Sequence, residues 1–517
     1  MNIFKLVRVL KQIQLLSPRN LFDLLTAFYR QGVNLMMLAD FANQLYGQKP
    51  VLTSDKGTTL YSVLFTRSQQ LSTVLYQSYG IKKGKKIAFL CKNDDALIPS
   101  LIAGSRLGAD LYLLNAELGR KQFLRLIDHH NYDLLIYGEE LEETISQALE
   151  EMDVICLQLQ KLVASLSPDP CDLNGVPRTF MGKLVLMTGG TTGHAKEAQH
   201  KISLFAYLHP FAAIITQLNL LSCRTAYIAT PLYHGYGIAV LLVFFALGKH
   251  AIITKEFHEK EACRLVDEYQ AEVMTAVPLM VHKMLQENPE AMQSLKCIAS
   301  GGAELNPQLV KRVAGELGPV LFNLYGTSET GLNTIAGPED LAMSAKTIGK
   351  AIDGVTIRIM DAAGRNMPIG EIGQLHIKNG GAVSASSGSW IATGDLGYSD
   401  KQNYYFLAGR TDDRIVSAGE NVYPHDLAAI LFLHPAIEDL AVVGVPDPVF
   451  GQRLKAFIQL KNGVKETPEE IKQWLKGRAA RFQMPKELVI VDQLPYTAIG
   501  KLNKKMLLRN EEAKSEI

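Results

Sequence analysis

The sequence lacks several signatures that would assign a function directly. Its six cysteines are scattered, with no C-x-x-C pair and no metal-ligand spacing, which argues against a zinc site and favours buried thiols in a reducing compartment. Positive and negative side chains nearly cancel, leaving a net charge of +1, so nucleic acid is not the expected partner. Neither the Walker pattern nor the G-x-G-x-x-G fingerprint fits the glycine-rich stretch of residues 187–198.

A membrane-spanning run is also missing. Residues 225–248 contain no Asp, Glu, Lys or Arg, but Pro231, Gly235 and Gly237 interrupt them. The apolar piece that remains is too short to cross a bilayer, so we expect a strand, a loop and a buried helix in this region.

The N-terminus lacks the features of a secretory signal. Three basic residues interrupt its apolar residues and no small-residue cleavage site follows, so we expect a cytoplasmic protein. On a helix, an apolar face would oppose a basic one: Ile3, Leu6, Val7, Leu10 and Ile13 against Lys5, Arg8 and Gln12. Such a helix can rest on a membrane surface; the alternative is that it packs on its own domain.

What the sequence does contain is a long alternation of strand and helix patterns. Between Lys85 and Gly326, short apolar runs alternate with helix-length segments such as residues 95–107 and 256–269. The runs are KIAFLC, LYLLN, DLLIY, KLVLM, AYIAT, HAIIT, VMTAV, CIAS and VLFNL. Continuous apolar runs joined by helices predict parallel strands buried on both faces. We therefore expect an α/β fold with ligands at the carboxyl ends of the strands.

The pattern changes in the last third of the 517 residues. From Gly349 to Tyr405, short β runs (TIRIM, QLHIK, YYFLA) alternate with Gly and Pro turns, which predicts a small β-barrel-like piece at about 340–408. The residues after Gly409 suit a small α+β domain. We expect a large domain over 1–408 and a small one over 409–517.

The stretch MTGGTTGHAKEA, residues 187–198, follows an apolar run and is rich in glycine and threonine. Glycine backbone N–H groups, threonine hydroxyls and a lysine are suited to hold phosphate. A plain turn between a strand and a helix is the alternative. Four further blocks decide between them: YGTSET from Tyr325, TGDLGY from Thr393, GRTDDRIVSAGENVYP from Gly409 and LPYTAIGKLNKK from Leu494.

In this order, the five blocks resemble the adenylate-forming enzymes, the superfamily of acyl-CoA synthetases, luciferases and peptide-synthetase adenylation domains. The resemblance covers nearly the whole chain. It implies that a carboxylate attacks the α-phosphate of ATP to give an acyl-adenylate and pyrophosphate, and that a thiol, usually that of coenzyme A, then takes the acyl group. Such chemistry depends on positioning and on neutralising charge.

The resemblance also implies roles for individual residues. The departing phosphates would be held by Thr188, Thr191, Thr192 and Lys196 and by the backbone of Gly189, Gly190 and Gly193. The nucleotide would further contact Gly301, Gly302, Ala303, Tyr325, Gly326, Thr327, Ser328, Asp395 and Arg410. Among these, Tyr325 matches the adenine-stacking ring and Asp395 the ribose ligand, and Glu329 would hold Mg²⁺.

The C-terminal blocks would supply catalysis and the second half-reaction. Lys501 matches the lysine that contacts the carboxylate and the α-phosphate during adenylation. Asp412 matches the hinge of the small domain, and Gly419 matches the glycine that borders the pantetheine channel. With Thr188 and Glu329, Lys501 completes the expected catalytic set.

The opening loop departs from the superfamily's usual SGTTGKPKG. Gly189, His194, Ala195 and Glu197 differ from it, which removes one hydroxyl and one cation and adds an anion near the phosphates. These changes weaken the expected phosphate grip. A nucleotide-binding protein that has lost turnover is therefore an alternative, although the presence of Lys501 argues against it.

The acid is less well defined by the sequence. PLYHGYG, residues 231–237, resembles the acyl-pocket block, which makes His234, Ser300 and Gly301 the candidate pocket residues. The apolar run IAVLLVFFALG favours fatty or aromatic acids over amino acids. The block GADLYLLNAELGRKQF and the basic N-terminus most resemble bacterial fatty-acyl-CoA ligases, so we expect a medium- or long-chain fatty acid, with an aryl acid as the alternative. We expect small-molecule partners only (ATP, acid and CoA, or a separate carrier protein in place of CoA), with the chain acting as a monomer or homodimer.

Overall fold

The chain folds into two compact units. The structure is a computed structural model that describes residues 11, 15, 17–118, 120–148, 152–166, 175–188, 196–200, 204–379, 389–417, 420–497, 501–504 and 506–509. The first unit comprises residues 1–345, 351–355 and 378–389; the second comprises 346–350, 356–377 and 390–517. Most of the β-rich piece is thus grouped with the C-terminal residues, and the domain boundary at residue 408 stays a prediction.

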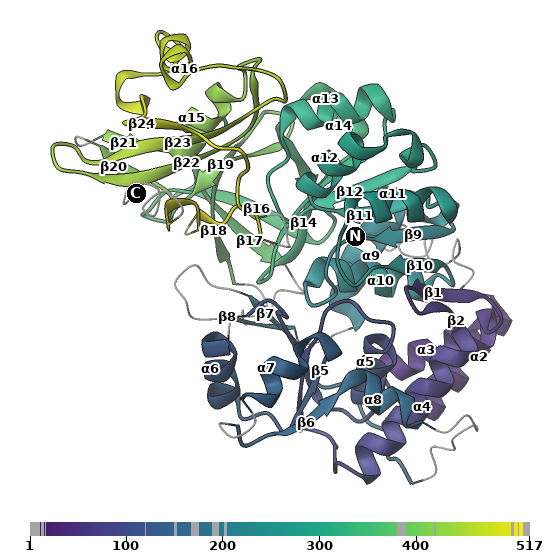
Figure 1. Cartoon of the computed structure of the whole chain (residues 1–517). Helices are drawn as coiled ribbons and strands as arrows, with labels where there is room; N and C mark the ends of the chain where they lie inside the picture. The colour runs from purple at the N-terminus through teal and green to yellow at the C-terminus, as the bar shows by residue number, and fades with distance from the viewer. Residues whose placement is uncertain are drawn as a thin grey trace. The chain divides into compact units, whose positions relative to one another are not determined.

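The first unit contains a large, mainly parallel sheet (Figure 1). Its strands, in spatial order, are β14 (Gly331–Ala336), β13 (Leu321–Thr327), β12 (Cys297–Gly301), β11 (Val273–Ala276), β9 (Thr225–Ile228), β10 (His250–Ile253), β1 (Pro50–Ser54) and β2 (Gly57–Leu60). Strands β13 to β1 run parallel, and β14 and β2 are antiparallel to their neighbours.

A second sheet of this unit is built from β6 (Ile155–Gln158), β5 (Leu134–Tyr137), β3 (Lys86–Leu90), β4 (Asp110–Leu114), β7 (Leu184–Thr188) and β8 (Lys196–His200). All its pairs are parallel except β7 with β8. The nine apolar runs therefore form strands as predicted. The strand after β7 was not expected, because the composition of the glycine-rich stretch indicates a loop or a turn before a helix.

Helices connect and cover these strands. They are α2 (Pro18–Gln31), α3 (Leu35–Tyr46), α4 (Tyr61–Gln77), α5 (Leu97–Arg106), α6 (Arg120–His130), α7 (Glu142–Ser146), α8 (Leu159–Ala164), α9 (Leu204–Gln217), α10 (Gly235–Ala246), α11 (Glu259–Glu268), α12 (Pro278–Glu287), α13 (Pro307–Glu316) and α14 (Pro338–Met343). The helices expected at 95–107 and 256–269 are α5 and α11. The N-terminal helix expected over the first residues lies outside the described part of the chain.

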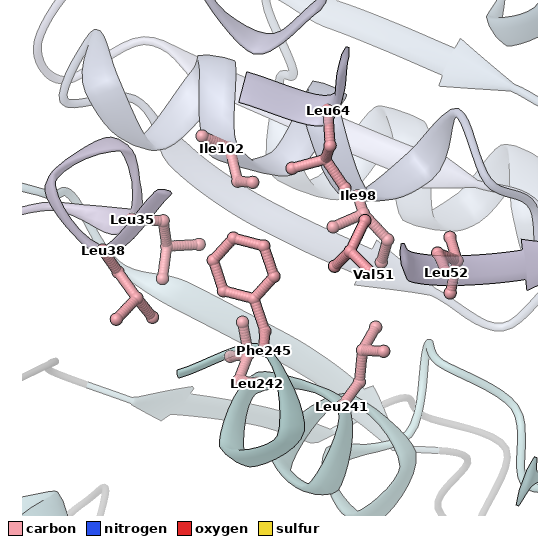
Figure 2. Close-up of a pocket in the computed structure, with 10 residues that line it drawn as sticks. All are labelled: Leu35, Leu38, Val51, Leu52, Leu64, Ile98, Ile102, Leu241, Leu242 and Phe245. Carbon is pink, nitrogen blue, oxygen red and sulfur yellow. The ribbon is translucent and has the colours of Figure 1, made fainter. Parts of the chain in front are cut away.

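The uncharged stretch of residues 225–248 forms β9, a loop and α10, as expected. Figure 2 shows Leu241, Leu242 and Phe245 of α10 facing Leu35 and Ile102 across an apolar gap. The gap has room for no more than about one water molecule, so this part of α10 is committed to packing. Among the described residues, no helix is both long enough and apolar enough to cross a membrane.

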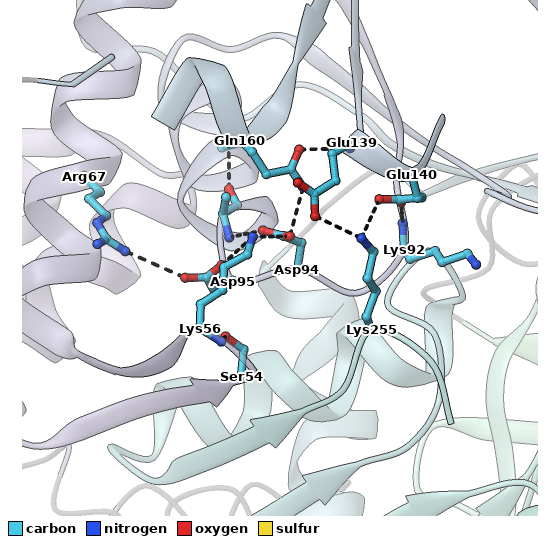
Figure 3. A network of polar contacts seen from close by, with 12 residues as sticks. Ser54, Lys56, Arg67, Lys92, Asp94, Asp95, Glu139, Glu140, Gln160 and Lys255 are labelled. Atoms are coloured by element: carbon cyan, nitrogen blue, oxygen red, sulfur yellow. Dashed lines mark hydrogen bonds and ion pairs between the residues drawn. The ribbon is translucent and has the colours of Figure 1, made fainter. Parts of the chain in front are cut away.

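A charged network connects strand ends of the two sheets in the first unit (Figure 3). Lys56, after β1, lies 2.6 Å from Asp94, after β3. Lys255, after β10, lies 3.1 Å from Glu139 and 3.2 Å from Glu140, which follow β5. Burial opposes ionisation of Asp94, but the hydrogen bond from Lys56 lowers its pKa. The network ties the carboxyl ends of β3, β5 and β10 together.

The second unit contains two β systems, which are antiparallel except that β24 pairs with β23 in parallel. One has the order β16 (Val355–Met360), β17 (Gly373–Asn379), β18 (Ile391–Ser399), β19 (Tyr405–Arg410) and β15 (Thr347–Ala351). The other has β21 (Glu420–Val422), β20 (Ile415–Ser417), β23 (Gly451–Leu460) and β22 (Ile437–Asp447), with β24 (Glu487–Ile490) beside β23. Helices α15 (Pro424–Leu431) and α16 (Pro468–Leu475) complete it. The β runs expected at 356–360, 374–378 and 404–408 are confirmed.

Candidate active site

The glycine-rich loop is flanked by two paired strands. Thr188 ends β7, Lys196 begins β8, and these two residues are directly opposite each other in the antiparallel register. Residues 189–195, which include Gly189, Gly190, Thr191, Thr192 and Gly193, lie outside the described residues. The described backbone therefore brings the two ends of the predicted phosphate loop together.

The carboxyl ends of β12 and β13 lie side by side, because Gly301 is paired with Leu324 in parallel register. Tyr325 follows Leu324 and is only 8% exposed. Gly302, Ala303 and Glu304 follow Gly301 and leave the sheet. Two blocks separated by some twenty residues of sequence are therefore neighbours at one sheet edge, as expected for a ligand site in an α/β fold.

The YGTSET block forms a tight turn between β13 and β14. A Cβ atom at Gly326 would lie 2.3 Å from the carbonyl oxygen of Gly331, so only glycine fits there without a backbone shift. The hydroxyls of Thr327 and Thr330 lie 2.9 Å apart, and Asn379 donates to the Thr330 carbonyl at 2.9 Å. These bonds hold the turn that carries Ser328 and Glu329.

The candidate acyl-pocket residues Ser300 and Gly301 lie at the end of β12, close to α10. Ser300 is fully buried, and its Oγ has no hydrogen-bond partner among the described residues. Tyr236 of α10 donates its hydroxyl to the backbone carbonyl of Ala299. A Cβ atom built on Gly301 would lie 3.8 Å from the Tyr236 ring. The ring thus closes the space beside the end of β12, and burial raises its hydroxyl pKa well above the ordinary value.

His234 lies two residues before Tyr236, at the N-cap of α10. Its ring centroid is 4.6 Å from that of Tyr233. The loop before it is fixed by Asn93, which accepts from the backbone N–H of Leu232 at 2.7 Å and donates to the Thr230 carbonyl at 3.3 Å. The contact between Tyr236 and Ala299 was not predicted, although the PLYHGYG block contains Tyr236, because the bond joins residues far apart in the chain.

In the second unit, Asp395 and Arg410 face each other across β18 and β19. Arg410 donates to Asp395 at 3.2 Å and to Asp412 at 2.9 Å. Partial burial disfavours its charge, but the hydrogen bond to Asp412 and the carboxylate of Asp395 raise the Arg410 pKa. Burial likewise opposes ionisation of Asp412, and Arg410 lowers its pKa. The Arg410–Asp412 pair is therefore ionised at neutral pH.

Lys501 is exposed and sits in a closed turn. Its backbone N–H donates to Thr497 Oγ1 at 3.2 Å, and its carbonyl accepts from the Thr497 N–H at 2.8 Å. Next to this turn, Tyr496 donates its hydroxyl to Asp439 of β22 at 2.6 Å. The turn is thereby anchored to the sheet of the second unit. Gly419 lies outside the described residues, between the paired ends of β20 and β21.

Residues 39–385 match the AMP-binding enzyme family, and residues 426–501 match the AMP-binding enzyme C-terminal domain. The chain belongs to this family. The predicted resemblance to adenylate-forming enzymes is confirmed.

Individual relatives support the same assignment. The chain is 28% identical over 489 residues to a 2-succinylbenzoate–CoA ligase of Bacillus velezensis, covering 92% of this chain and 97% of the relative. The amide bond synthetase McbA of Marinactinospora thermotolerans superposes with a TM-score of 0.80 at 23% identity, over 91% and 98% of the two chains. The o-succinylbenzoate CoA synthetase of Bacillus subtilis superposes with a TM-score of 0.76 at 23% identity, over 91% and 97%.

These similarities confirm the predicted fold class and the enzyme class, an AMP-forming CoA ligase. In such an enzyme, the acid is activated as an acyl-AMP before transfer to CoA. The roles assigned to the nucleotide, acyl and catalytic residues stay predictions.

Proposed function

We propose that this AMP-forming ligase activates an aromatic carboxylic acid and transfers it to CoA. The observation that carries the proposal is the combination of a fixed aromatic ring and a buried hydroxyl at the end of β12. Tyr236 supplies a fixed ring beside Gly301, and Ser300 supplies a buried hydroxyl that lacks a partner among the described residues. A flat acid with a polar substituent can stack on such a ring and accept or donate one hydrogen bond.

The apolar run of α10, which was expected to line the acyl pocket, gives little support to a long-chain fatty acid. Leu241, Leu242 and Phe245 pack against α3 and α5 (Figure 2), whereas Val240 and Phe244 are buried in the core under α10. The run therefore has few side chains left to line a long channel. The curated relative named as a 2-succinylbenzoate–CoA ligase also acts on an aromatic acid.

The family resemblance implies a role in nucleotide binding for several named residues. We assign the adenine to Tyr325 and the segment Gly301–Gly302–Ala303, the ribose hydroxyls to Asp395, and ribose or phosphate to Arg410. A carboxylate can accept hydrogen bonds from both ribose hydroxyls, and a guanidinium gives charge-assisted bonds to phosphate. The glycine-rich loop with Thr188 and Lys196 would receive the β- and γ-phosphates.

Glu329 fits the role of a magnesium ligand. It lies half-buried in the turn after β13, and within the described part of the chain its carboxylate makes no hydrogen bond or ion pair. A free carboxylate oxygen is the donor that Mg²⁺ prefers. When bound, the ion would neutralise charge on the phosphates of ATP, and Thr327 and Asn379 would keep the Glu329 turn in place.

The chemistry then follows from the positions of charge. A carboxylate oxygen of the acid attacks the α-phosphorus of ATP, the bond to the β-phosphate oxygen breaks, and pyrophosphate leaves with the electron pair. Lys501 would neutralise the negative charge that both reactants bring to this step. In the second step the CoA sulfur attacks the acyl carbon and AMP leaves. Asp412 would be the hinge residue of the small domain. Gly419 would border the channel for the pantetheine arm of CoA.

ATP–pyrophosphate exchange tests the proposal. The protein is assayed with a panel of aryl, fatty and amino acids, each with and without CoA. We expect exchange with aryl acids and thioester formation when CoA is added. Exchange that is fastest with a long-chain fatty acid would contradict the aryl assignment, and thioester formed only on a carrier protein would contradict CoA as the acceptor.

Substitution of Tyr236 tests the pocket itself. Tyr236→Ala removes the ring beside Gly301 and should shift kcat/KM towards longer acids, by about tenfold for two or three added methylenes. Tyr61→Ala is the matched control, because it removes another ring whose hydroxyl donates to backbone carbonyls in the buried core but which lies on α4. An equal shift in selectivity for both variants would show that Tyr236 does not line the pocket.

A further inference from the structure

Helix α2 exposes a continuous apolar stripe. Leu21, Phe22, Leu25, Phe28 and Tyr29 are 43%, 69%, 57%, 47% and 73% exposed. Their spacing places them on one face of the helix. Across the described residues, 19 large apolar side chains are exposed, and five of them lie on this helix of 14 residues. Single exposed apolar residues are ordinary, but a stripe of this kind marks an interaction surface.

The opposite face of α2 is firmly attached to the first unit. The helix packs on α3 (Figure 1), and its buried residues are Ala27 and Gln31. Gln31 donates to Asp40 at 2.9 Å and accepts from Arg106 at 3.2 Å. Ser17 caps its N-terminus by accepting from the Asn20 N–H at 3.3 Å. The helix is therefore a rigid support that holds the stripe outward.

A second segment extends the stripe. Phe180 is 66% exposed, and its neighbours are bonded to the residues just after α2. Met181 donates its N–H to Val33, and Asn34 donates to the Thr179 carbonyl, both at 2.9 Å. Arg178 lies 5.0 Å from the ring centroid of Tyr29 and donates to the Tyr29 carbonyl. A cation is thus fixed beside the aromatic end of the stripe.

The positive charge around the stripe favours an anionic partner. The first 31 residues are rich in Lys and Arg but contain a single acid, Asp23, whereas the whole chain has a net charge of only +1. Arg19 and Arg30, at the two ends of α2, are exposed. A second copy of the chain would bring these cations against each other, which is unfavourable. An anionic lipid surface complements them and also accepts Phe, Leu and Tyr at the headgroup level.

We propose that α2 and Phe180 form a docking face for an anionic membrane surface. The apolar stripe would enter the headgroup boundary, and Arg19, Arg30 and Arg178 would contact lipid phosphates. This contact is independent of the acid that the enzyme activates. It places a peripheral attachment on the first unit, in a helix distinct from the basic residues that precede it.

Vesicle flotation of the full chain tests this face. The probes are vesicles of phosphatidylcholine alone and of phosphatidylcholine mixed with phosphatidylglycerol. We expect flotation with the mixed vesicles and loss of it at high salt. Phe22→Ser combined with Leu25→Ser should lower the partition coefficient by about tenfold or more. Arg19→Ala combined with Arg30→Ala should lower it by about fivefold for each arginine.

Two control measurements distinguish loss of this face from a general loss of apolar surface or of folding. Leu433→Ser combined with Phe482→Ser removes a matched pair of exposed side chains from the second unit and should leave flotation unchanged. Every variant should keep the parent's melting temperature and its pyrophosphate exchange without lipid.

Three results would overturn the proposal. In the first, the unsubstituted protein does not float with the mixed vesicles at any salt concentration. In the second, the Phe22/Leu25 variant, with residues 1–16 intact, floats like the parent, which would assign binding to another segment. In the third, the parent forms a dimer that this variant dissociates, which would assign the stripe to a second copy of the chain.

Discussion

The candidate residues of the two units differ in burial and charge. In the first unit, Ser300 and Tyr325 are buried and neutral, and a backbone carbonyl fixes the Tyr236 hydroxyl. In the second, Lys501 is exposed and the Arg410 and Asp412 side chains are 49% and 48% exposed. Buried neutral groups on strand ends select the shape of a substrate, whereas exposed ionised groups stay hydrated until a charged ligand arrives. We infer that Ser300 and Tyr236 of the first unit select the acid. Lys501 and Arg410 of the second unit would add charge to that of Glu329 and Lys196 in the first.

Lys501→Ala tests the role of the exposed charged residues and should have the largest effect on activity. Loss of a cation that neutralises the reacting oxygens should slow pyrophosphate exchange by about 10²–10³-fold. Transfer from supplied acyl-AMP to CoA should change little, because that step does not require the same charge. Both half-reactions are measured separately with one acid.

Lys504→Ala is the control for Lys501. Lys504 lies three residues further along and pairs with Asp413 at 2.5 Å. Removing this partly exposed pair should cost well under about 1 kcal/mol of stability and leave exchange unchanged. Comparable losses in both variants would mean that general positive charge, rather than Lys501, supports adenylation.

Asp395→Asn should have the next largest effect. Replacing a charged acceptor of the ribose hydroxyls with a neutral one should raise KM for ATP by about 10- to 100-fold. The matched control is Asp361→Asn, because Asp361 also pairs with an arginine, Arg365, at 2.8 Å in the same unit. An unchanged KM for ATP in Asp395→Asn would mean that Asp395 does not bind the ribose.

Roles for the charged residues could be predicted from the family resemblance, and they stay predictions, whereas no sequence signal indicated the contact between Tyr236 and Ala299. Asp395, Arg410 and Lys501 each stand in a motif that resembles a block of the adenylate-forming enzymes. The nine apolar runs also predicted their strands, because burial on both faces of a parallel sheet imposes continuous apolar sequence. The Tyr236–Ala299 bond depends instead on how α10 crosses the sheet, and no local pattern encodes that. The strand after the glycine-rich stretch was missed for a similar reason, because KEAQH becomes a strand only by pairing with β7.

Gly326→Ala tests whether the first unit depends on a rigid turn. The added Cβ would meet the Gly331 carbonyl, so the backbone must shift at a cost of about 1–3 kcal/mol in the free energy of unfolding. The turn that carries Glu329 should move with it, which lowers kcat as well. Gly315→Ala, in α13 with no atom within 4 Å of the new Cβ, should instead stabilise by about 0.5–1 kcal/mol. Thermal melting measures both variants. A change in melting temperature in the same direction for both would contradict the assignment of strain to Gly326.

Ser300→Ala should have the smallest effect on activity, and it tests most directly whether a buried neutral residue binds the acid. The Ser300 Oγ is desolvated without a partner in the described residues, so its removal should keep or raise the melting temperature. If the hydroxyl bonds to the acid, KM for the acid should rise by about fivefold, which corresponds to one ordinary hydrogen bond.

Ser105→Ala is the opposite case. Ser105 is equally buried, but its Oγ accepts from the Leu35 N–H at 3.0 Å, so that variant should lower the melting temperature and leave KM unchanged. A buried hydroxyl whose loss costs affinity but no stability is one that the fold holds for its substrate. A fall in the Ser300→Ala melting temperature with KM unchanged would place Ser300 among the structural hydroxyls, and the pocket would then have to be defined by Tyr236 alone.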